Sequence, residues 1–63
     1  MKRRELLDHL RQHGCALVRE GGRHSIYGNP ATGNVAPVPR HVEIDNRLAV
    51  AICRQLGIPP IRH

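Results

Sequence analysis

The chain has 63 residues, and its ten lysines and arginines against five aspartates and glutamates give a formal charge of +5. A chain this short buries only about 60% of the surface that its unfolded form exposes, so it forms one domain with a thin core and has no room for a large substrate cleft. The dense positive charge indicates a polyanionic partner, and nucleic acid is favoured over a membrane surface because no helix with a large apolar face is evident.

The first predicted element is an amphipathic helix over residues 2–13. Leu6, Leu7 and Leu10 recur at three- and four-residue spacing between charged side chains. Gly14 is expected to end this helix, because glycine readily takes the left-handed conformation found after a last helical turn.

Three short strands are predicted next, over residues 15–19, 24–28 and 35–40. Residues 20–22 contain two glycines and read as a tight connection. Residues 29–34 are rich in Asn, Pro, Thr and Gly and read as a turn. Three strands joined by two short turns predict an antiparallel sheet.

The second and third strands carry features that set their place in the sheet. In the second strand, His24 and Ile26 share one face and Ser25 and Tyr27 the other. In the third, two prolines at positions 37 and 39 lack the amide proton needed for pairing on both sides, which predicts an edge strand.

The last predicted element is a helix with Asp45, or alternatively Asn46, as its N-cap and a stop over residues 57–59. Ile58 is expected to fold back on the final turn, and residues 59–63 are expected to form a flexible tail. The apolar residues that recur at helical spacing in this last helix are Leu48, Ala51, Ile52 and Leu56.

The element order predicts an α+β fold of the form α-β-β-β-α, with residues 1–63 as a single domain. Both helices are expected on one face of the three-stranded antiparallel sheet, because such a sheet cannot bury its apolar side alone. The opposite face is left to solvent or to a partner. The predicted core consists of Leu6, Leu10, Leu17, Ile26, Val35, Leu48, Ile52 and Leu56.

Cys15 and Cys53 stand far apart, and no signal peptide or long apolar stretch is recognised. They predict two buried thiols in a reduced, cytoplasmic compartment. A zinc site made by these cysteines with His24 and His41 is not expected, because the spacing fits no compact ligand pattern. We expect no metal and no cofactor.

The segment from Gly21 to Tyr27 carries the chemistry. It sets His24 at the start of a strand, behind the flexible Gly21 and Gly22 and beside the charge of Arg23. Histidine can take and give a proton near neutrality, while an arginine can hold a phosphate. The alternative interpretation is an ordinary surface histidine after a turn.

With these residues placed, the chain resembles the HicA family, toxin endoribonucleases of bacterial toxin–antitoxin pairs. Two departures from the family pattern are Asn46-Arg47 before the last helix's first leucine and the extra proline Pro37. The likeness rests on Met1-Lys2 with Glu5-Leu6 and Leu10, on Gly14, on the segment from Gly21 to Tyr27, and on Val38-Pro39-Arg40-His41 running into Glu43-Ile44.

The resemblance implies a fold similar to a double-stranded-RNA-binding domain, metal-free RNA cleavage and a catalytic histidine at His24. In such cleavage the RNA's own 2′-hydroxyl attacks, which requires a base and positive groups near the phosphate. His24 is the predicted base. Ordinary duplex binding is not expected, because Arg47 is the one cation at the start of the last helix.

Further residues are predicted to act beside His24. The amides of Gly21 and Gly22 and the guanidinium of Arg23 are candidate phosphate ligands. His41 is a candidate general acid, with strand capping or pairing to Glu43 as its structural alternative. The wider set predicted to bind RNA comprises Arg40, Tyr27, Lys2, Arg3 and Arg4.

Two of these assignments have open alternatives. Tyr27, the single aromatic residue, either stacks one base or packs, so RNA binding should be driven by phosphate contacts and be weakly selective. The charges of Lys2, Arg3 and Arg4 oppose the dipole of the first helix, and either RNA, an acidic partner or solvent compensates them.

The resemblance also implies a protein partner, a cognate HicB-like antitoxin that covers His24. The edge strand at residues 35–38 is a candidate docking site, where the partner would add a strand to the sheet. The toxin alone is expected to be monomeric and to form a hetero-oligomer with the antitoxin. The first rival function is a non-catalytic RNA-binding module of the same fold. A DNA-binding regulator is the second, although no helix offers side chains suited to base edges.

Overall fold

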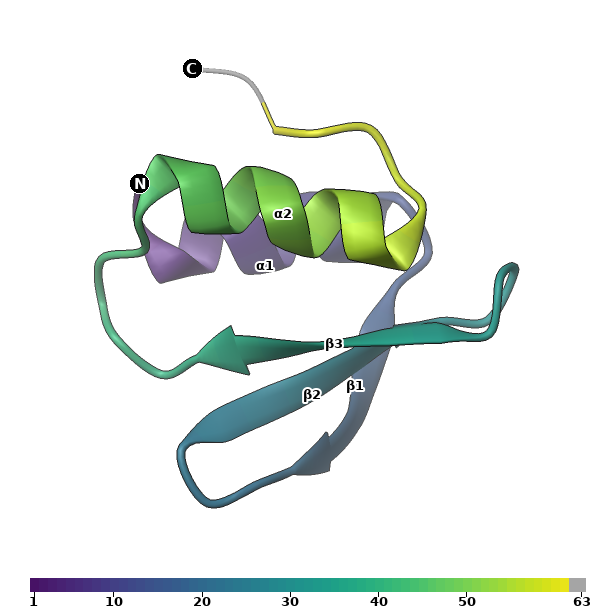
Figure 1. Cartoon of the computed structure of the whole chain (residues 1–63), viewed down its shortest axis with the longest axis horizontal. Coiled ribbons are helices and arrows are strands. Elements are labelled where there is room, and N and C mark those ends of the chain that lie inside the picture. Colours follow the sequence, from purple (N-terminus) through teal and green to yellow (C-terminus); the bar gives the residue numbers. More distant parts are fainter. Residues whose placement is uncertain (62–63) are drawn as a thin grey trace.

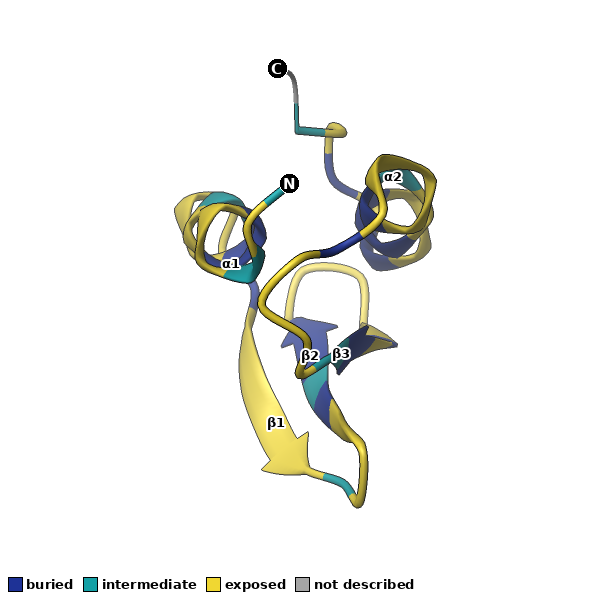
Figure 2. Ribbon diagram, turned by 90° about the vertical axis from the view of Figure 1, so that its left-hand side faces the viewer, coloured by how far each residue is buried: buried dark blue, intermediate teal, exposed yellow. Residues whose placement is uncertain are grey.

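The computed structural model describes residues 1–61. Its elements are α1 (Arg3–Gln12), β1 (Ala16–Glu20), β2 (His24–Asn29), β3 (Asn34–Pro39) and α2 (Asn46–Leu56). The strands form one antiparallel sheet in the order β1-β2-β3, and both helices lie on the same side of it (Figures 1 and 2). The predicted α+β fold is confirmed.

The first helix begins and ends as its sequence predicts. Lys2 occupies the N-cap position, and its backbone N–H donates to Glu5 Oε1 at 3.1 Å. The helix ends where Gly14 takes a φ of 84°, which lets the Cys15 N–H reach back to the Leu10 carbonyl at 2.9 Å. The apolar stripe that faces the core consists of Leu6, Leu7 and Leu10.

The second helix has the predicted caps at both ends. Asp45 Oδ1 accepts from the Arg47 N–H at 2.7 Å. At the other end, Gly57 has a φ of 75°, and the Ile58 N–H donates to the Cys53 carbonyl at 3.0 Å. Ile58 is buried, so the predicted fold-back of the chain at this helix end is confirmed.

The predicted core is correct for four residues and wrong for the other four. Leu17, Val35 and Leu48 are 47%, 49% and 40% exposed, and Ile26 is half-buried. Ile26 and Val35 project from the open face of the sheet, because side chains alternate along a strand. The core-facing residues are Leu6, Leu7, Leu10, Cys15, Tyr27, Ala36, Val38, Ile44, Ala49, Ile52, Cys53, Leu56 and Ile58.

In α2, the prediction placed the buried stripe one residue too early along the helix. Its buried stripe begins at Ala49 and continues through Ile52, Cys53 and Leu56, whereas the prediction began the stripe at Leu48. In β1 every residue is exposed, Leu17 included, and the pairing with β2 shifts between Leu17 and Arg19. An irregular edge strand of this kind buries little even where its side chains face the helices.

The edge position of β3 explains how it carries two prolines. The Val35 carbonyl accepts from Gln55 Nε2 at 2.9 Å, so it points away from β2. Backbone groups alternate in direction along a strand, so Pro37 and Pro39 also face outward, where a missing N–H breaks no bond to β2. The Pro39 carbonyl is likewise occupied, by Arg3 Nε at 2.8 Å.

The predicted flexible tail, residues 59–63, is in part packed. The Pro59 carbonyl lies 2.6 Å from His9 Nε2, and Ile61 packs against the core. His9 therefore ties the chain's last described segment to α1. Residues 62 and 63 lie outside the described residues.

Both cysteines are buried and unpaired, as predicted. Burial raises the pKa of the Cys15 and Cys53 thiols, which keeps them protonated and poorly nucleophilic. Within residues 1–61, no three His, Cys, Asp or Glu side chains gather closely enough to hold a metal ion. No helix in the same range has the length and apolar character needed to cross a membrane.

Candidate active site

His24 is the first residue of β2 and stands on the sheet face opposite the helices. Its neighbour Ser25 and the next inward residue, Tyr27, are buried at 1% and 4% exposure, whereas His24 is exposed. Its cross-strand partner is Pro39 of β3. The imidazole therefore stands free on the open face, where a polymeric substrate can reach it.

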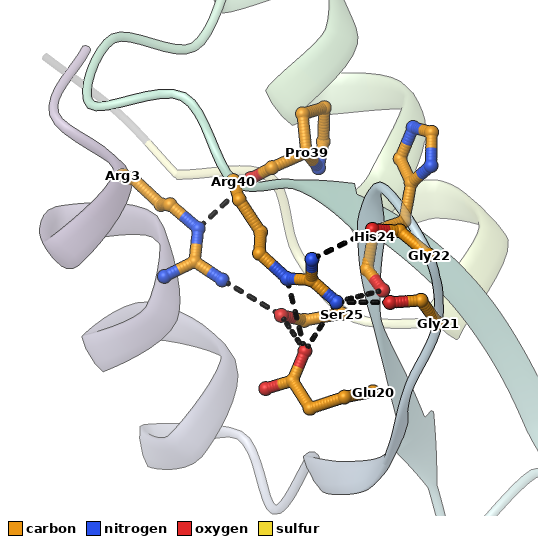
Figure 3. A network of polar contacts seen from close by, with 8 residues as sticks. All are labelled: Arg3, Glu20, Gly21, Gly22, His24, Ser25, Pro39 and Arg40. Atoms are coloured by element: carbon orange, nitrogen blue, oxygen red, sulfur yellow. Dashed lines mark hydrogen bonds and ion pairs between the residues drawn. The ribbon is translucent and has the colours of Figure 1, made fainter.

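The connection that carries this histidine, residues 20–24, is called the His24 hairpin. The Gly21 N–H donates to the His24 carbonyl at 2.8 Å and closes the turn. Arg40 then spans the turn: Nη1 donates to the Gly22 carbonyl at 2.9 Å, and Nη2 donates to the carbonyls of Gly21 and, at 3.3 Å, of His24. One guanidinium thus holds three backbone carbonyls of the hairpin (Figure 3).

A carboxylate and a hydroxyl anchor that guanidinium to the rest of the fold. Glu20 Oε1 accepts from Arg40 Nε at 3.1 Å and from the Ser25 hydroxyl at 2.7 Å. Ser25 Oγ in turn accepts from Arg3 Nη2 at 2.9 Å, while Arg3 Nε donates to the Pro39 carbonyl. The network therefore joins α1, the His24 hairpin and the end of β3.

The charge state of this network follows from its hydrogen bonds. The pKa of Glu20 is lowered, chiefly by the hydrogen bond from the Ser25 hydroxyl and then by Arg40 and Arg3. Glu20 remains ionised at neutral pH and pairs with Arg40 at 3.0 Å. Both partners are about half exposed, so the pair contributes more to geometry than to stability.

Arg40 differs in the structure from the role predicted for it. It was expected to bind phosphate, but its donors face Glu20 and the hairpin carbonyls, and a guanidinium bonded to protein through all three nitrogens has little capacity left for RNA. Arg3 donates from Nε and Nη2 to Pro39 and Ser25, while none of the hydrogen bonds among residues 1–61 uses its Nη1, so Arg3 stays a candidate phosphate ligand. Both residues also support the hairpin.

The two glycines of the hairpin are also distinguished by the structure. Gly21 uses its N–H inside the turn, so this amide is withdrawn from the predicted phosphate ligands. A Cβ at this position would lie 3.1 Å from the His24 carbonyl, whereas a Cβ at Gly22 would meet nothing within 4 Å. The Gly22 amide stays in the candidate set, and so does the next amide, that of Arg23.

Within residues 1–61, the side chains of five exposed arginines make no hydrogen bond or ion pair to other protein groups: Arg4, Arg19, Arg23, Arg47 and Arg54. Arg47 and Arg54 lie on α2, and the other three lie outside that helix. Arg23 adjoins His24, and Arg19 pairs in register with Ile26, which places it on the same open face as the imidazole. The sequence singled out Arg4 and Arg23 but missed Arg19, because its face depends on the irregular pairing of β1.

The other predicted cations lie on the helix side of the sheet. Lys2 Nζ pairs with Glu43 Oε1 at 2.8 Å, which raises the pKa of Lys2 and lowers that of Glu43. Lys2 also lines a groove of about 440 Å³ together with Arg3, Arg4, Leu7 and Val42. Three of these lining residues belong to α1, on the helix side of the sheet, whereas His24 lies on the open face.

His41 and Tyr27 take the last places in the predicted set. His41 is exposed and lies two positions beyond Pro39, the cross-strand partner of His24. The alternative pairing of His41 with Glu43 does not occur, because Glu43 faces Lys2 and the N-terminus. Tyr27 packs in the core, so its ring has no free face for a base and we leave it out of the RNA-binding set.

Two residues of the site were not singled out from the sequence, Glu20 and Ser25. A register argument could have found them, because closing a hairpin over 21–24 brings positions 20 and 25 opposite each other, as observed. Two polar side chains at a partly buried cross-strand pair must be hydrogen-bonded. An arginine that follows the neighbouring strand is a natural partner for the negative charge of Glu20.

Comparison with known proteins gives one match. A model of the family described as "HicA toxin of bacterial toxin-antitoxin" matches residues 3–58. No curated protein and no solved structure matches the chain. The matched range contains both helices, the sheet, the His24 hairpin and the network that supports it.

Proposed function

The chain belongs to the HicA family of bacterial toxins, and on that premise we propose that it is an endoribonuclease that cleaves RNA, messenger RNA first among its substrates. The reaction is attack of the 2′-hydroxyl on the adjacent phosphate, with His24 as general base. No metal takes part in the proposed mechanism. The family places the protein in the toxin half of a toxin–antitoxin pair.

The observation that carries the proposal is the contrast between His24 and its support. The backbone of His24 is fixed, because its carbonyl accepts from the Gly21 N–H and from Arg40. Its imidazole instead points away from the network (Figure 3). A general base must be held in place and still reach its proton, and this arrangement meets both needs.

The proposed chemistry assigns each nearby group one task. His24 takes the proton of the 2′-hydroxyl, and the resulting alkoxide attacks phosphorus while the bond to the 5′-oxygen breaks. The charge that builds on the phosphate oxygens is stabilised by donors fixed beforehand, of which Arg23 and the exposed amides of the hairpin are nearest to His24 in the chain. His41 is the candidate acid that protonates the departing 5′-oxygen.

The exposed arginines extend the proposed RNA-binding surface beyond His24. Arg19 shares the open face with His24, and Arg4 borders the groove on the helix side. Each neutralised phosphate releases a counterion, so binding should weaken steeply as salt rises. With Tyr27 in the core, no Phe, Trp or Tyr among residues 1–61 is left to stack bases, and binding should show weak sequence preference.

We propose that the antitoxin partner covers His24 and the open face of the sheet. Such a partner would carry acidic residues opposite Arg19 and Arg23. The free edge of β3 is poorly suited to pairing with a strand of a partner. The Val35 and Pro39 carbonyls already accept hydrogen bonds from Gln55 and Arg3, and the two prolines of the edge, Pro37 and Pro39, offer no N–H. Strand addition at β3, which the sequence suggested, is therefore not part of the proposal.

Incubation of the purified protein with RNA in EDTA tests the proposal. The wild type should cut, and His24→Ala should lose cleavage while its affinity for RNA stays within about twofold, because proton transfer contributes on the order of 10²–10⁴ in rate. His13→Ala is the matched control, since His13 is the exposed C-cap residue of α1, and α1 lies on the sheet face opposite to that of His24. An equal rate for His24→Ala and wild type would refute the role of His24. RNA binding without cleavage in the wild type would instead identify the rival, a non-catalytic RNA-binding module.

A further inference from the structure

The role of Arg40 follows from the direction of the peptide groups it holds. In a trans peptide the C=O and the following N–H point in opposite directions. Arg40 draws in the carbonyls of Gly21 and Gly22, and these belong to the same peptide groups as the N–H of Gly22 and of Arg23. Both N–H groups must therefore point away from Arg40.

These two amides have no acceptor of their own. In the part of the chain that the structure describes, the N–H groups of Gly22 and Arg23 donate to no backbone carbonyl, whereas the Gly21 N–H is used in the turn. Two successive N–H groups that face away from the protein are both available to donate to an anion. They come directly before His24 in the chain, and the second is the amide of Arg23.

We propose that Arg40 is a positioning residue: it holds the His24 hairpin in one conformation, so that the N–H groups of Gly22 and Arg23 face the RNA phosphate beside His24. This inference deepens the proposed function and rests on it for the identity of the anion. Arg40 itself does not touch the RNA. Its charge acts on the protein's own carbonyls, with Glu20 as the anchor.

The number of acceptors explains why an arginine is needed. Arg40 reaches four groups, the Glu20 carboxylate and the carbonyls of Gly21, Gly22 and His24, from three nitrogens of a planar fork. A lysine ammonium carries three donors on one atom and cannot span the same acceptors. Arg40→Lys keeps the charge and loses the geometry, so it separates positioning from direct phosphate binding.

The first test compares Arg40→Lys and Arg40→Gln with wild type at a temperature where all are folded by circular dichroism. We expect cleavage to fall by about 10- to 100-fold in both variants, because a displacement of about 1 Å in a site costs up to that much. The salt slope of RNA affinity should stay unchanged in Arg40→Gln. Arg54→Gln, which removes an exposed charge from the last turn of α2, is the matched control and should cleave at the wild-type rate.

Direct phosphate binding by Arg40 predicts the opposite pattern. Arg40→Lys would then retain most of the cleavage, and Arg40→Gln would lower the salt slope by about 0.7, the value for one contact to single-stranded nucleic acid. Either result would overturn the proposal. Glu20→Gln is a second variant that keeps Arg40 and loosens its anchor, and it should lose cleavage by a smaller factor than Arg40→Gln.

The second test does not depend on cleavage. A 2′-O-methyl RNA oligonucleotide, which has no free hydroxyl to attack, is titrated into the ¹⁵N-labelled protein and the amide signals are followed. The N–H signals of Gly22 and Arg23 should shift in wild type and in Arg54→Gln and lose most of that shift in Arg40→Gln. Equal shifts in Arg40→Gln would overturn the positioning role. If the amides respond but the wild type cuts no RNA, the proposed nuclease fails while the positioning role of Arg40 stands.

Discussion

The two turns of the sheet are built in opposite ways. The His24 hairpin is held by charged groups at the surface, Arg40 and Glu20, and it leaves its imidazole and two amides facing outward. The other turn, residues 29–34 and here called the Asn29 hairpin, is held by uncharged groups. The buried Asn29 Nδ2 donates to the Leu56 carbonyl at 2.7 Å, at the end of α2.

The difference shows how a very small domain separates stability from function. The Asn29 hairpin satisfies a carbonyl at the end of α2 that would otherwise lack a partner, so it belongs to the core's support. The His24 hairpin buries little surface, and its hydrogen bonds fix the orientation of the hairpin backbone. Changes in the first should lower stability, and changes in the second should lower activity.

The largest expected effect is on activity, at His24. His24→Ala should reduce cleavage by about 10²–10⁴ and leave the melting temperature unchanged, because the side chain is exposed. Cleavage of a labelled oligonucleotide and a thermal scan on the same sample check both halves. A melting temperature that falls along with activity would contradict the contrast between the two hairpins, because His24 would then be a structural residue.

The next effect is on stability, at Asn29. Asn29→Ala leaves the Leu56 carbonyl with only its contact to Thr32 Oγ1 at 3.4 Å, so the free energy of unfolding should fall by about 1–3 kcal/mol. Urea unfolding measures this change. Cleavage per folded molecule should stay at the wild-type level, and a loss of cleavage in the folded variant would contradict the separation of the two hairpins.

A smaller loss of stability is expected at Gly57. Its φ of 75° costs an alanine about 1 kcal/mol or more, and a Cβ there would also lie 3.1 Å from Cγ2 of Thr32 in the Asn29 hairpin. Gly14→Ala is the control, with a φ of 84° and nothing within 4 Å. Gly57→Ala should therefore unfold at lower urea than Gly14→Ala. The reverse order would show that Gly57 does not pack closely on that hairpin.

The smallest expected effect is a response to acid confined to one hairpin. Because the fold lowers the pKa of Glu20, its contribution to stability is present above the ordinary value of 4.5 and is lost as pH falls through the lowered pKa. The Gly21 and Gly33 amides report the two hairpins, since each donates a 2.8 Å turn bond. Protection of the Gly21 amide from hydrogen exchange should fall below about pH 4.5 relative to that of Gly33. Glu20→Gln should abolish this pH dependence, and an equal response of both amides would contradict it.

Much of the fold could be predicted because its signals are local. Asp45 and Gly57 bound α2, Gly14 ends α1, and two prolines assign β3 to an edge, each through the chemistry of one residue. Which residues form the core was harder to predict. Apolar side chains occur on both faces of β2 and β3, so periodicity alone did not decide between Ile26 and Tyr27.

The candidate site shows the same limit. His24 could be singled out from its neighbours in the sequence, and the structure places it exposed as the proposal requires. The role of Arg40 could not, because its acceptors lie 16 to 20 residues away and depend on strand register. A charge in the sequence gives no sign of whether it faces solvent, a ligand or the protein's own carbonyls.

In the proposed reaction the 2′-hydroxyl of RNA is the nucleophile and His24 activates it. The chemical ends of the cut RNA test this most directly, determined by mass spectrometry after digestion in EDTA. Attack by the 2′-hydroxyl predicts a 2′,3′-cyclic phosphate on one fragment and a 5′-hydroxyl on the other, with no cut where the 2′-hydroxyl is replaced by hydrogen. A 5′-phosphate beside a 3′-hydroxyl, or continued cleavage at the 2′-deoxy position, would contradict it.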